Sequence, residues 1–364
     1  MKSEIFFMQR AIELSKFGKY NVSPNPMVGC VITEKSKIIS EGYHSKFGFD
    51  HAEIAALKKL KKKVNNKMNM YVSLEPCCHI GKTGPCVESI INSGIRNIYI
   101  AMLDPNPKVK GKGVKKLKSH GINVKVGICQ KEAEEVNKGF ISRIKKNKPY
   151  VTIKQAISID NKISNQKSKW ISNTDSRKDA QFIRAESCAI LIGAETLLKD
   201  NPKLNVKLKN SDLKTNIKIR NPIKIVLDSK LSIDISKYKL FKGKEKKIIF
   251  NNIITDFDEN NNIDYIKVSK NNLGLNLEPI LNILAKKYEI NYLMVEPGAK
   301  LLKSFVLKNL IDELIIYKCP LIIGKSGLSS FLISKEYLNK NNIEIDTIKQ
   351  ISNDVKIIYK FKRK

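Results

Sequence analysis

In the first part of the chain, segments in which apolar residues recur with helical spacing alternate with short apolar segments typical of strands. Met8, Ala11 and Ile12 lie near helical spacing, which predicts an amphipathic helix over residues 4–16. The prolines of the loop 23–26 block continuation of that helix. Beyond the loop we expect strands at 28–32, 37–42, 71–74, 98–102 and 124–126, and helices at 51–60, 86–93, 113–119 and 131–145.

A polar, proline-closed stretch at 145–149 divides the chain, so the predicted domains are residues 1–146 and 147–364. Residues 201–221 are basic and irregular, and no element is predicted there. After the boundary we expect strands at 150–158, 189–192, 223–227, 247–250, 292–295 and 314–317, helices at 175–185, 279–287 and 300–308, and a surface loop at 260–262. This alternation predicts an α/β fold with a mostly parallel sheet and helices on both faces.

The first domain contains residue types that bind and use zinc. One residue separates His51 from Glu53, and Cys77 and Cys86 each follow a proline. One imidazole and two thiolates leave a position of a zinc ion open, as catalysis requires, and a nearby carboxylate can move protons. His-x-Glu followed by Pro-Cys is typical of nucleobase deaminases, in which the glutamate is not a ligand. We therefore predict His51, Cys77 and Cys86 as ligands and Glu53 as the catalytic residue.

Two other side chains compete for the metal. Cys78 and His79 lie between Cys77 and Cys86, where the usual motif has only two residues between its cysteines. We choose Cys77 and Cys86 because a Pro-Cys step suits a strand end or a first helical turn. Cys78 would point away from Cys77 in an extended segment. The alternatives are a site that uses Cys78 or His79, and a structural zinc in a protein without catalysis.

The formal charge is +32, from 67 Lys and Arg against 35 Asp and Glu. Such a charge could attract RNA, and an RNA base deaminase with a degenerate second domain is the alternative function. However, lysines are spread along the whole chain, and aromatic residues are not interleaved with the basic runs. We expect no nucleic-acid partner, but a surface that attracts phosphorylated pyrimidine small molecules.

The first residues do not resemble a signal peptide, and no apolar run approaches the roughly 20 residues of a membrane span. Seven cysteines, three of them clustered with histidine, favour metal binding in a reducing compartment over a disulfide framework. These features predict a cytoplasmic protein with no membrane partner.

The second domain shows weaker chemical signals. Glu296-Pro297-Gly298 lies between a predicted strand and a predicted helix, where backbone amides can bind phosphate, but an ordinary turn is the simpler interpretation. Arg184 and Lys207 could pair with a substrate phosphate, although solvated surface residues are the default.

Motifs in both domains carry a resemblance to a known family. In the first domain they are Pro24-Asn25-Pro26, Val28-Gly29-Cys30-Val31-Ile32, Gly42-Tyr43-His44, His51-Ala52-Glu53, Leu74-Glu75-Pro76-Cys77, Gly81-Lys82-Thr83, Pro85-Cys86 and Asp104-Pro105-Asn106-Pro107. In the second they are Ser158-Ile159-Asp160, Lys169-Trp170-Ile171-Ser172, Asp200-Asn201-Pro202, Leu227-Asp228-Ser229 and Val295-Glu296-Pro297-Gly298. In these motifs the chain resembles, over nearly its entire length, the bifunctional riboflavin biosynthesis protein, a pyrimidine deaminase joined to a pyrimidine reductase.

The resemblance implies a cytidine-deaminase-like three-layer domain followed by a dihydrofolate-reductase-like domain. It implies two consecutive reactions, with one Zn²⁺ per chain and NADPH as cofactors. In the first, water activated by zinc and Glu53 would deaminate 2,5-diamino-6-(5-phosphoribosylamino)pyrimidin-4(3H)-one. In the second, NADPH would reduce the ribosyl group to give 5-amino-6-(5-phosphoribitylamino)uracil. Because the reductase fold commonly pairs through a strand edge, a homo-oligomer, dimer or tetramer, is expected.

Family roles carry over to three groups of residues. The deaminase substrate would contact Asn25, His44, Lys82, Asp104 and Asn106. NADPH would contact Ala156, Trp170, Thr196, Asp200, Ser229, Gly298, Ala299, Lys300, Leu301, Leu302, Lys303 and Ser304. The reductase substrate would contact Lys154, Ser168, Arg184, Leu204, Lys207 and Glu296.

Several positions depart from the family pattern. Lys207 stands where arginine is usual, Asn161 replaces a glycine, Cys78 a serine and Gly84 a proline. Arginine can hold phosphate with two parallel hydrogen bonds, whereas lysine acts as a point charge. The pattern therefore predicts weaker substrate binding by the reductase domain.

Overall fold

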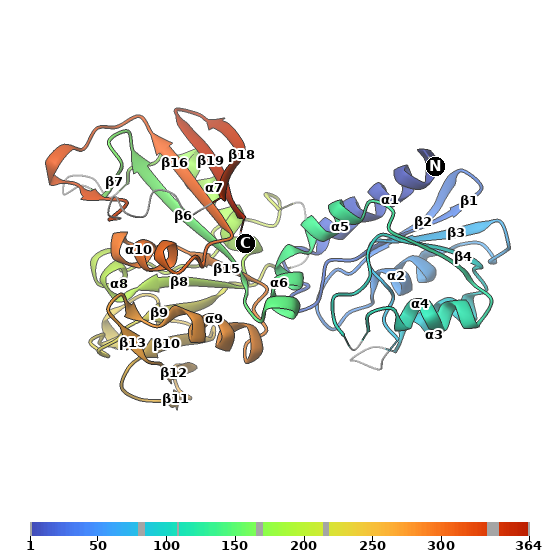
Figure 1. Ribbon diagram of the computed structural model, residues 1–364, viewed down its shortest axis with the longest axis horizontal. Helices are drawn as coiled ribbons and strands as arrows, with labels where there is room; N and C mark the ends of the chain where they lie inside the picture. The colour runs from blue at the N-terminus through green and yellow to red at the C-terminus, as the bar shows by residue number, and fades with distance from the viewer. Residues whose placement is uncertain are drawn as a thin grey trace. The chain divides into compact units, whose positions relative to one another are not determined.

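The structure, a computed structural model, describes residues 2–78, 84–107, 109–164, 170–213, 218–332 and 342–362. The chain divides into two compact units, Met1–Asn147 and Lys148–Lys364 (Figure 1). Within the described residues, no helix combines the length and apolar character needed to cross a membrane.

The first unit is built on a five-stranded sheet with the order β2-β1-β3-β4-β5. Its strands are β1 (Gly29–Glu34), β2 (Lys37–Tyr43), β3 (Met68–Val72), β4 (Asn97–Ile100) and β5 (Asn123–Val126). β1 is antiparallel to β2 and β3, whereas β3, β4 and β5 are parallel. The carboxyl ends of β3 and β4 therefore lie at the same edge, where both following loops begin.

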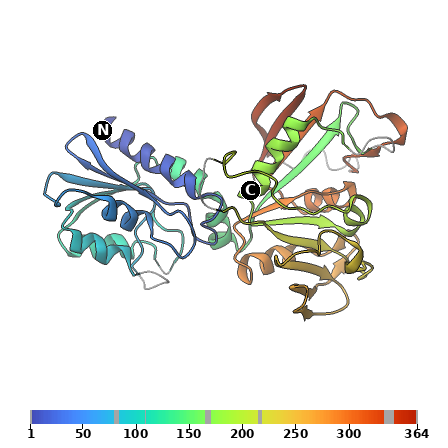
Figure 2. The same cartoon turned by 180° about the vertical axis from the view of Figure 1, so that it is seen from behind.

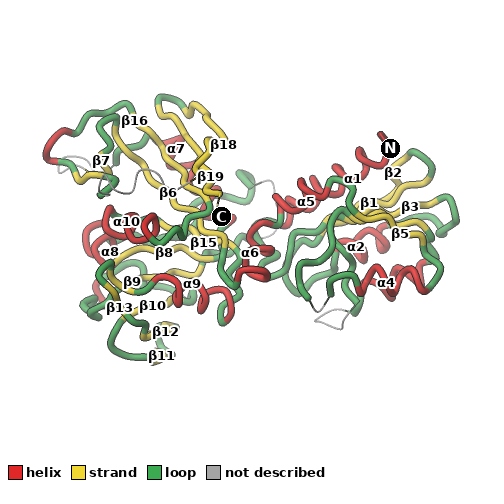
Figure 3. Tube along the Cα trace, in the orientation of Figure 1, coloured by secondary structure: helices red, strands yellow, loops and turns green. Residues whose placement is uncertain are grey.

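Helices cover both faces of this sheet and make it a three-layer unit (Figure 3). The helices are α1 (Lys2–Ser15), α2 (Ala52–Lys59), α3 (Cys86–Ser93), α4 (Lys112–Ser119), α5 (Gln130–Val136) and α6 (Lys138–Lys146), with a 3₁₀ turn η1 (Lys16–Gly18). Successive residues of β1 point to opposite faces: Cys30 and Ile32 pack with α2 and α3, whereas Val31 packs with α1 and α5. The three-layer architecture expected for this domain is confirmed.

Most elements of the first unit lie where the sequence predicts them, but two differ. β3 begins at Met68, before the predicted range 71–74, because the half-buried Asn69 alternates with two buried methionines. The helix predicted at 131–145 is interrupted at Asn137. The Asn137 side chain accepts the N–H of Met27 at 2.8 Å and donates to its carbonyl at 2.9 Å, so tertiary contacts override helix continuity.

The second unit is built on a ten-stranded sheet with the order β11-β12-β10-β9-β8-β15-β6-β16-β19-β18. Its strands are β6 (Tyr150–Ser158), β8 (Ala189–Gly193), β9 (Ile223–Leu227), β10 (Lys247–Asn251), β11 (Asp256–Asp258), β12 (Ile263–Lys267), β15 (Tyr292–Val295), β16 (Glu313–Cys319), β18 (Asn342–Ile351) and β19 (Asp354–Lys362). In this spatial order, each strand from β12 through β16 is parallel to the next. β11 is antiparallel to β12 at one edge, and β19 is antiparallel to both β16 and β18 at the other. Two small sheets pair β13 (Lys270–Asn271) with β14 (Gly274–Leu275), and β17 (Leu328–Ser329) with β7 (Lys162–Ser164).

Helices lie on both faces of the large sheet, as predicted. α9 (Leu277–Lys286) and α10 (Ala299–Leu307) bury their apolar side chains in one core. On the other face, α8 (Ala194–Asp200) and α7 (Thr174–Glu186) contribute to two smaller cores, and Figure 2 shows this arrangement from behind. Two 3₁₀ turns, η2 (Ile235–Lys237) and η3 (Gly324–Ser326), lie in the connections.

The sequence patterns did not predict α8, the strands β11 and β12, or the C-terminal hairpin of β18 and β19. In β18 the apolar residues Ile343, Ile345 and Ile348 are exposed, so their alternation does not mark a buried face. The described part of 201–221 contains no helix or strand, in agreement with the irregular pattern.

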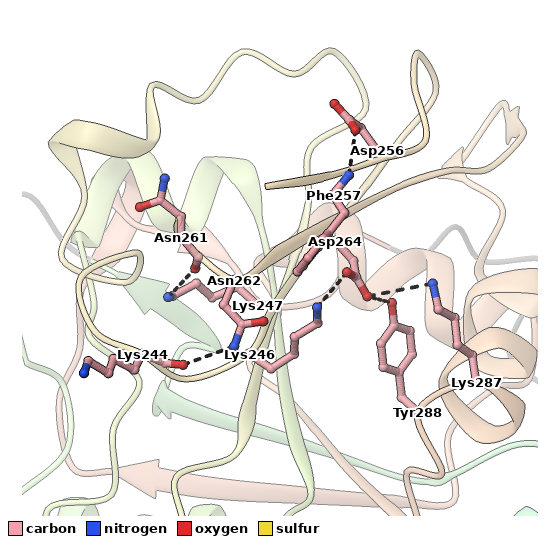
Figure 4. A network of polar contacts seen from close by, with 10 residues as sticks. All are labelled: Lys244, Lys246, Lys247, Asp256, Phe257, Asn261, Asn262, Asp264, Lys287 and Tyr288. Atoms are coloured by element: carbon pink, nitrogen blue, oxygen red, sulfur yellow. Dashed lines mark hydrogen bonds and ion pairs between the residues drawn. The ribbon is translucent and has the colours of Figure 1, made fainter. Parts of the chain in front are cut away.

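A polar network surrounds Asp264 on β12, the strand next to the β11 edge of the large sheet (Figure 4). Asp264 on β12 accepts a hydrogen bond from Lys246 Nζ at 2.6 Å and another from the Tyr288 hydroxyl, and Lys287 Nζ lies 3.8 Å away. Burial and the hydrogen bond to Asp264 raise the pKa of Tyr288. The network fixes the end of α9 to the sheet.

Candidate functional site

Three side chains from different elements meet at the edge of the first sheet. His51 is the N-cap of α2, Cys77 follows β3, and Cys86 is the first residue of α3. His51 Nδ1 lies 3.1 Å from Cys86 Sγ and 3.5 Å from Cys77 Sγ, and the Cys86 N–H donates to Cys77 Sγ at 3.4 Å. Their ligand atoms all lie within 4.8 Å of one another.

This donor set fits a zinc ion. A hydrogen bond from the Cys86 thiol lowers the pKa of Cys77 to about 4, and the same pairing, together with burial, raises the pKa of Cys86. Zinc binds thiolates, so an ion held by both sulfur atoms would displace the thiol proton. One nitrogen and two sulfurs leave a fourth position of a tetrahedral zinc ion open. Cys78 packs against the apolar core instead, and His79 lies outside the described residues.

Glu53 lies in the first turn of α2, two residues after His51, and is only 3 % exposed. Burial, and then the charge of Cys77, raise the pKa of Glu53 to about 7. A carboxyl group with that pKa can both accept and donate a proton near neutral pH. Glu53 interacts with both Cys77 and Cys86, and its role in proton transfer stays a prediction.

Two residues predicted to bind the deaminase substrate are connected to each other. His44 Nε2 lies 3.1 Å from Asn25 Nδ2, and its Nδ1 lies 3.0 Å from the Asp50 carbonyl. Because the amide of Asn25 donates to Nε2, the proton of His44 is on Nδ1. Burial lowers the pKa of His44, so the ring is neutral. The rings of His44 and His51 are 5.2 Å apart, which places the pair beside the metal-binding cluster.

Asp104 and Asn106 lie after β4, at the sheet edge that also carries Cys77. Asp104 Oδ1 accepts the N–H of Asn106 at 2.8 Å, which fixes the loop. Glu75 joins this loop to the segment of Cys77, a connection that sequence reasoning missed although Glu75 belongs to a motif quoted above. Lys82, also predicted to bind the substrate, lies outside the described residues.

The second unit contains a pocket of about 400 Å³ at the carboxyl ends of β8, β9 and β15. It is bounded by the N-termini of α8 and α10, whose N-caps are Gly193 and Gly298. Helix N-termini attract phosphate groups. Six residues predicted to bind NADPH line it: Thr196, Ser229, Gly298, Lys300, Leu301 and Ser304.

Other residues of the predicted cofactor group do not line this pocket. Leu302 is fully buried in the core, and Trp170 is 55 % exposed with the Arg177 guanidinium 5.1 Å from its ring centre. The remaining ones are Ala156 on β6, Asp200 at the end of α8, and Ala299 and Lys303 on α10.

Glu296 is the centre of a charged group at the end of β15. Its Oε1 lies 3.0 Å from Arg184 Nη2 on α7 and 3.6 Å from Lys154 Nζ on β6. Burial raises the pKa of Glu296, but Lys154 and Arg184 outweigh burial and leave the pKa below its ordinary value. Arg184 also donates to the Asn205 carbonyl at 3.2 Å, and among the described residues its buried Nε has no hydrogen-bond partner.

Of the other residues predicted to bind the reductase substrate, Leu204 and Lys207 are among the described residues. Leu204 is a buried core residue, one position before Asn205. The backbone N–H of Lys207 donates to Gln181 Oε1 at 3.0 Å, and its side chain is exposed. Ser168 lies outside the described residues.

In the first unit, His51, Cys77 and Cys86 lie together beside buried Glu53, which is the arrangement of a zinc-dependent nucleobase deaminase. Residues 1–102 match the cytidine and deoxycytidylate deaminase zinc-binding region, and residues 149–357 match the RibD C-terminal domain family. Riboflavin biosynthesis protein RibD of Buchnera aphidicola is 39 % identical to the chain, with 98 % of each chain covered. That of Escherichia coli is 34 % identical, over 88 % of this chain and 89 % of the relative.

Two solved structures extend the similarity to the fold of the whole chain. RibD of Acinetobacter baumannii superposes with a TM-score of 0.89 at 32 % identity, and 99 % of each chain is covered. A diaminohydroxyphosphoribosylaminopyrimidine deaminase/5-amino-6-(5-phosphoribosylamino)uracil reductase of Thermotoga maritima gives 0.86, also at 32 % identity and with 99 % of each chain covered. The chain belongs to the RibD family. It is a bifunctional enzyme of riboflavin biosynthesis with a deaminase domain and a reductase domain, and the RNA deaminase alternative is not favoured.

Proposed function

We propose that the first domain deaminates 2,5-diamino-6-(5-phosphoribosylamino)pyrimidin-4(3H)-one and that the second reduces the product with NADPH to 5-amino-6-(5-phosphoribitylamino)uracil. The observation that carries the proposal is the cluster of His51, Cys77 and Cys86 next to buried Glu53, in a chain that matches a reductase family over 149–357. The Thermotoga relative, which is similar over 99 % of this chain, is named for these two activities. We assign the deaminase to residues 1–146 and the reductase to 147–364.

In the deaminase, His51, Cys77 and Cys86 would hold one Zn²⁺ per chain. When bound, zinc activates a water molecule for attack on the amino-bearing carbon. Glu53 would take a proton from that water and pass it to the departing amine, as a carboxyl group buried beside the cluster can do. Asn25, neutral His44, Asp104, Asn106 and Lys82 orient the pyrimidine and its ribose phosphate.

In the reductase, NADPH would lie in the pocket between the N-termini of α8 and α10. NADPH supplies the hydride, and the protein orients the cofactor. Thr196, Ser229, Gly298, Lys300, Leu301 and Ser304 line the pocket and support this assignment, and Ala156, Trp170, Asp200, Ala299, Leu302 and Lys303 complete the proposed cofactor group.

The reductase substrate would lie at the charged group of Glu296. Arg184 and Lys154 offer positive charge for its phosphate, and Glu296 holds both cations in place. Ser168, Leu204 and Lys207 complete the proposed substrate contacts.

Measurement of the two half-reactions tests the assignment. The zinc-loaded protein should release ammonia from the diaminopyrimidine without NADPH, and it should oxidise NADPH when given the deaminated intermediate. Ammonia release alone would limit the function to the first domain. Activity on RNA with none on the diaminopyrimidine would contradict the proposal.

We also propose that the chain forms a homo-oligomer through β18. This strand ends the order of the large sheet, and Ile343, Ile345 and Ile348 on it are 48 %, 58 % and 63 % exposed. Their partners across the hairpin are Phe361, Tyr359 and Ile357, so the three isoleucines share one face. Exposed edges with apolar side chains favour pairing with another copy.

Light scattering coupled to gel filtration checks this oligomer. The wild type should be a dimer or tetramer, and Ile345→Lys should lower its mass. Ile253→Lys, at an isoleucine that is 49 % exposed on a loop outside the sheet, is the control and should not. A monomeric wild type would contradict the proposal.

We place the reactions in the cytoplasm, with small-molecule partners only. All seven cysteines are free, and two of them gather with a histidine, which suits a reducing compartment.

A further inference from the structure

Glu75 is a buried carboxylate that joins the metal-binding segment to the loop of Asp104 and Asn106. It lies two residues before Cys77 and is 3 % exposed. Its own backbone N–H donates to the Met102 carbonyl at 2.9 Å, so it continues the pairing of β3 with β4 beyond the strands. A charged group this deeply buried requires partners.

Three backbone N–H groups supply those partners. Glu75 Oε2 accepts the N–H of Asp104 at 3.1 Å and that of Gly111 at 2.9 Å, and Oε1 accepts the N–H of Val114 at 3.1 Å. Hydrogen bonds to an ionised acceptor are stronger than those between neutral groups. Removal of the carboxylate would leave these donors without their partner in a buried environment.

Two glycines, Gly111 and Gly113, allow the start of α4 to lie close to the segment of Glu75. Gly111 has a φ of 76°, a left-handed conformation that favours glycine, and it caps α4. At Gly113 a Cβ would lie 2.4 Å from the Pro76 carbonyl oxygen, so glycine allows α4 to approach the metal-binding segment. Because Asp104 in turn accepts the N–H of Asn106, Glu75 fixes the conformation of both loop residues.

We propose that Glu75 is a positioning residue of the deaminase, which holds Asp104 and Asn106 at the correct place relative to the metal ligands. It therefore acts on substrate binding more than on the chemical step. The inference rests on the proposed deamination at the cluster of His51, Cys77 and Cys86.

Glu75→Gln tests the proposal, because glutamine keeps the shape but presents an NH₂ group to at least one backbone donor. We expect the KM for the diaminopyrimidine to rise about tenfold or more, while kcat changes by less than about threefold. Zinc content and the reductase rate with the deaminated intermediate should equal those of the wild type. Glu88→Gln, at a half-buried α3 glutamate paired with Lys116 of α4, is the matched control and should change neither constant.

Hydrogen exchange provides a readout that is independent of activity. In the wild type the amides of Asp104, Gly111 and Val114 should exchange slowly, and Glu75→Gln should accelerate at least one of them by about tenfold or more. If Glu75→Gln changed neither the KM nor the exchange rates of these amides, the proposal would be overturned. A lower kcat or a loss of zinc at constant KM would overturn it as well. Absence of ammonia release by the wild type would instead contradict the proposed function, while the exchange data would still test the connection itself.

Discussion

His51 Nδ1 lies 3.1 Å from Cys86 Sγ, although 35 positions separate the two residues in the chain. His51 caps α2 and Cys86 opens α3, so the N-termini of both helices meet at the proposed metal site. The positive ends of the helix dipoles favour the thiolate that a metal requires. The proposed ligand set therefore depends on the fold of the first domain, and each member can be tested singly.

Replacement of one ligand should abolish zinc binding. In Cys86→Ser one of two soft ligands is lost, and we expect loss of stoichiometric zinc and a fall in ammonia release of at least about 100-fold. Metal analysis and the half-reaction assays measure both effects, and the reductase rate should be retained. Cys78→Ser is the matched control. Zinc loss in that variant, with zinc retained in Cys86→Ser, would indicate the alternative ligand set.

Glu53→Gln should separate catalysis from metal binding. The amide cannot move a proton, so we expect ammonia release to fall by about 10²–10⁴-fold while zinc stays bound. Steady-state rates together with the zinc content of the same preparation check this prediction. Undiminished ammonia release at full zinc occupancy would remove Glu53 from the proton transfer.

The elements that the sequence predicted well are those whose pattern is set by local burial. The helix at 86–93 and the strand at 150–158 have the predicted bounds because their apolar residues face a core, with helical spacing in the helix and alternation in the strand. The prediction of one continuous helix at 131–145 was wrong because the side chain of Asn137 binds the backbone of Met27, which is 110 positions away. The hairpin of β18 and β19 was missed since Ile343, Ile345 and Ile348 of β18 are exposed and most of β19 is only half-buried.

The same distinction applies to the sites. The spacing of His51, Glu53, Cys77 and Cys86 pointed to their chemistry, and the structure brings them together. Nothing in the spacing indicated that Glu75 accepts three backbone N–H groups, because these donors lie 29 to 39 positions further along the chain. Contacts of this kind follow from the tertiary fold alone.

A negative charge in the pocket of the second domain should weaken cofactor binding. In Ser229→Glu the carboxylate would face the phosphates of NADPH, and we expect the KM for NADPH to rise at least about tenfold. Ammonia release should stay at the wild-type rate. Ser211→Glu makes the same change at an exposed position away from the pocket lining and should leave KM unchanged. An unaltered KM in Ser229→Glu would place NADPH elsewhere.

Lys207→Arg should improve the reductase. A guanidinium group can hold a phosphate with two parallel hydrogen bonds, which the lysine of this chain cannot do. We expect the KM for the deaminated intermediate to fall by about two- to tenfold at similar kcat. Steady-state kinetics with saturating NADPH measure the change. An equal or higher KM would remove Lys207 from the substrate contacts.

Glu296 should make the stability of the second domain depend on pH. Burial opposes its ionisation, but Lys154 and Arg184 lower the pKa below the ordinary value of 4.5. The stabilisation is therefore fully present above about pH 4.5 and is lost as the pH falls through the lower pKa of the folded state. The melting temperature of the wild type should exceed that of Glu296→Gln near neutral pH, and the difference should shrink below about pH 4.5.

The matched control for this pH experiment is Glu278→Gln. Glu278 is an exposed partner of Lys148, and its replacement should give no pH-dependent difference. A difference between wild type and Glu296→Gln that stays constant from neutral to acid pH would contradict the lowered pKa.

The most direct test of the central claim is a coupled assay with zinc-loaded protein, the diaminopyrimidine phosphoriboside and NADPH, in which ammonia release and NADPH oxidation are followed together. We expect both signals, with ammonia preceding NADPH oxidation. Glu53→Ala should lose both and regain NADPH oxidation when the deaminated intermediate is added. NADPH oxidation by Glu53→Ala without that addition, or wild-type protein that yields neither signal, would contradict two consecutive reactions at separate sites.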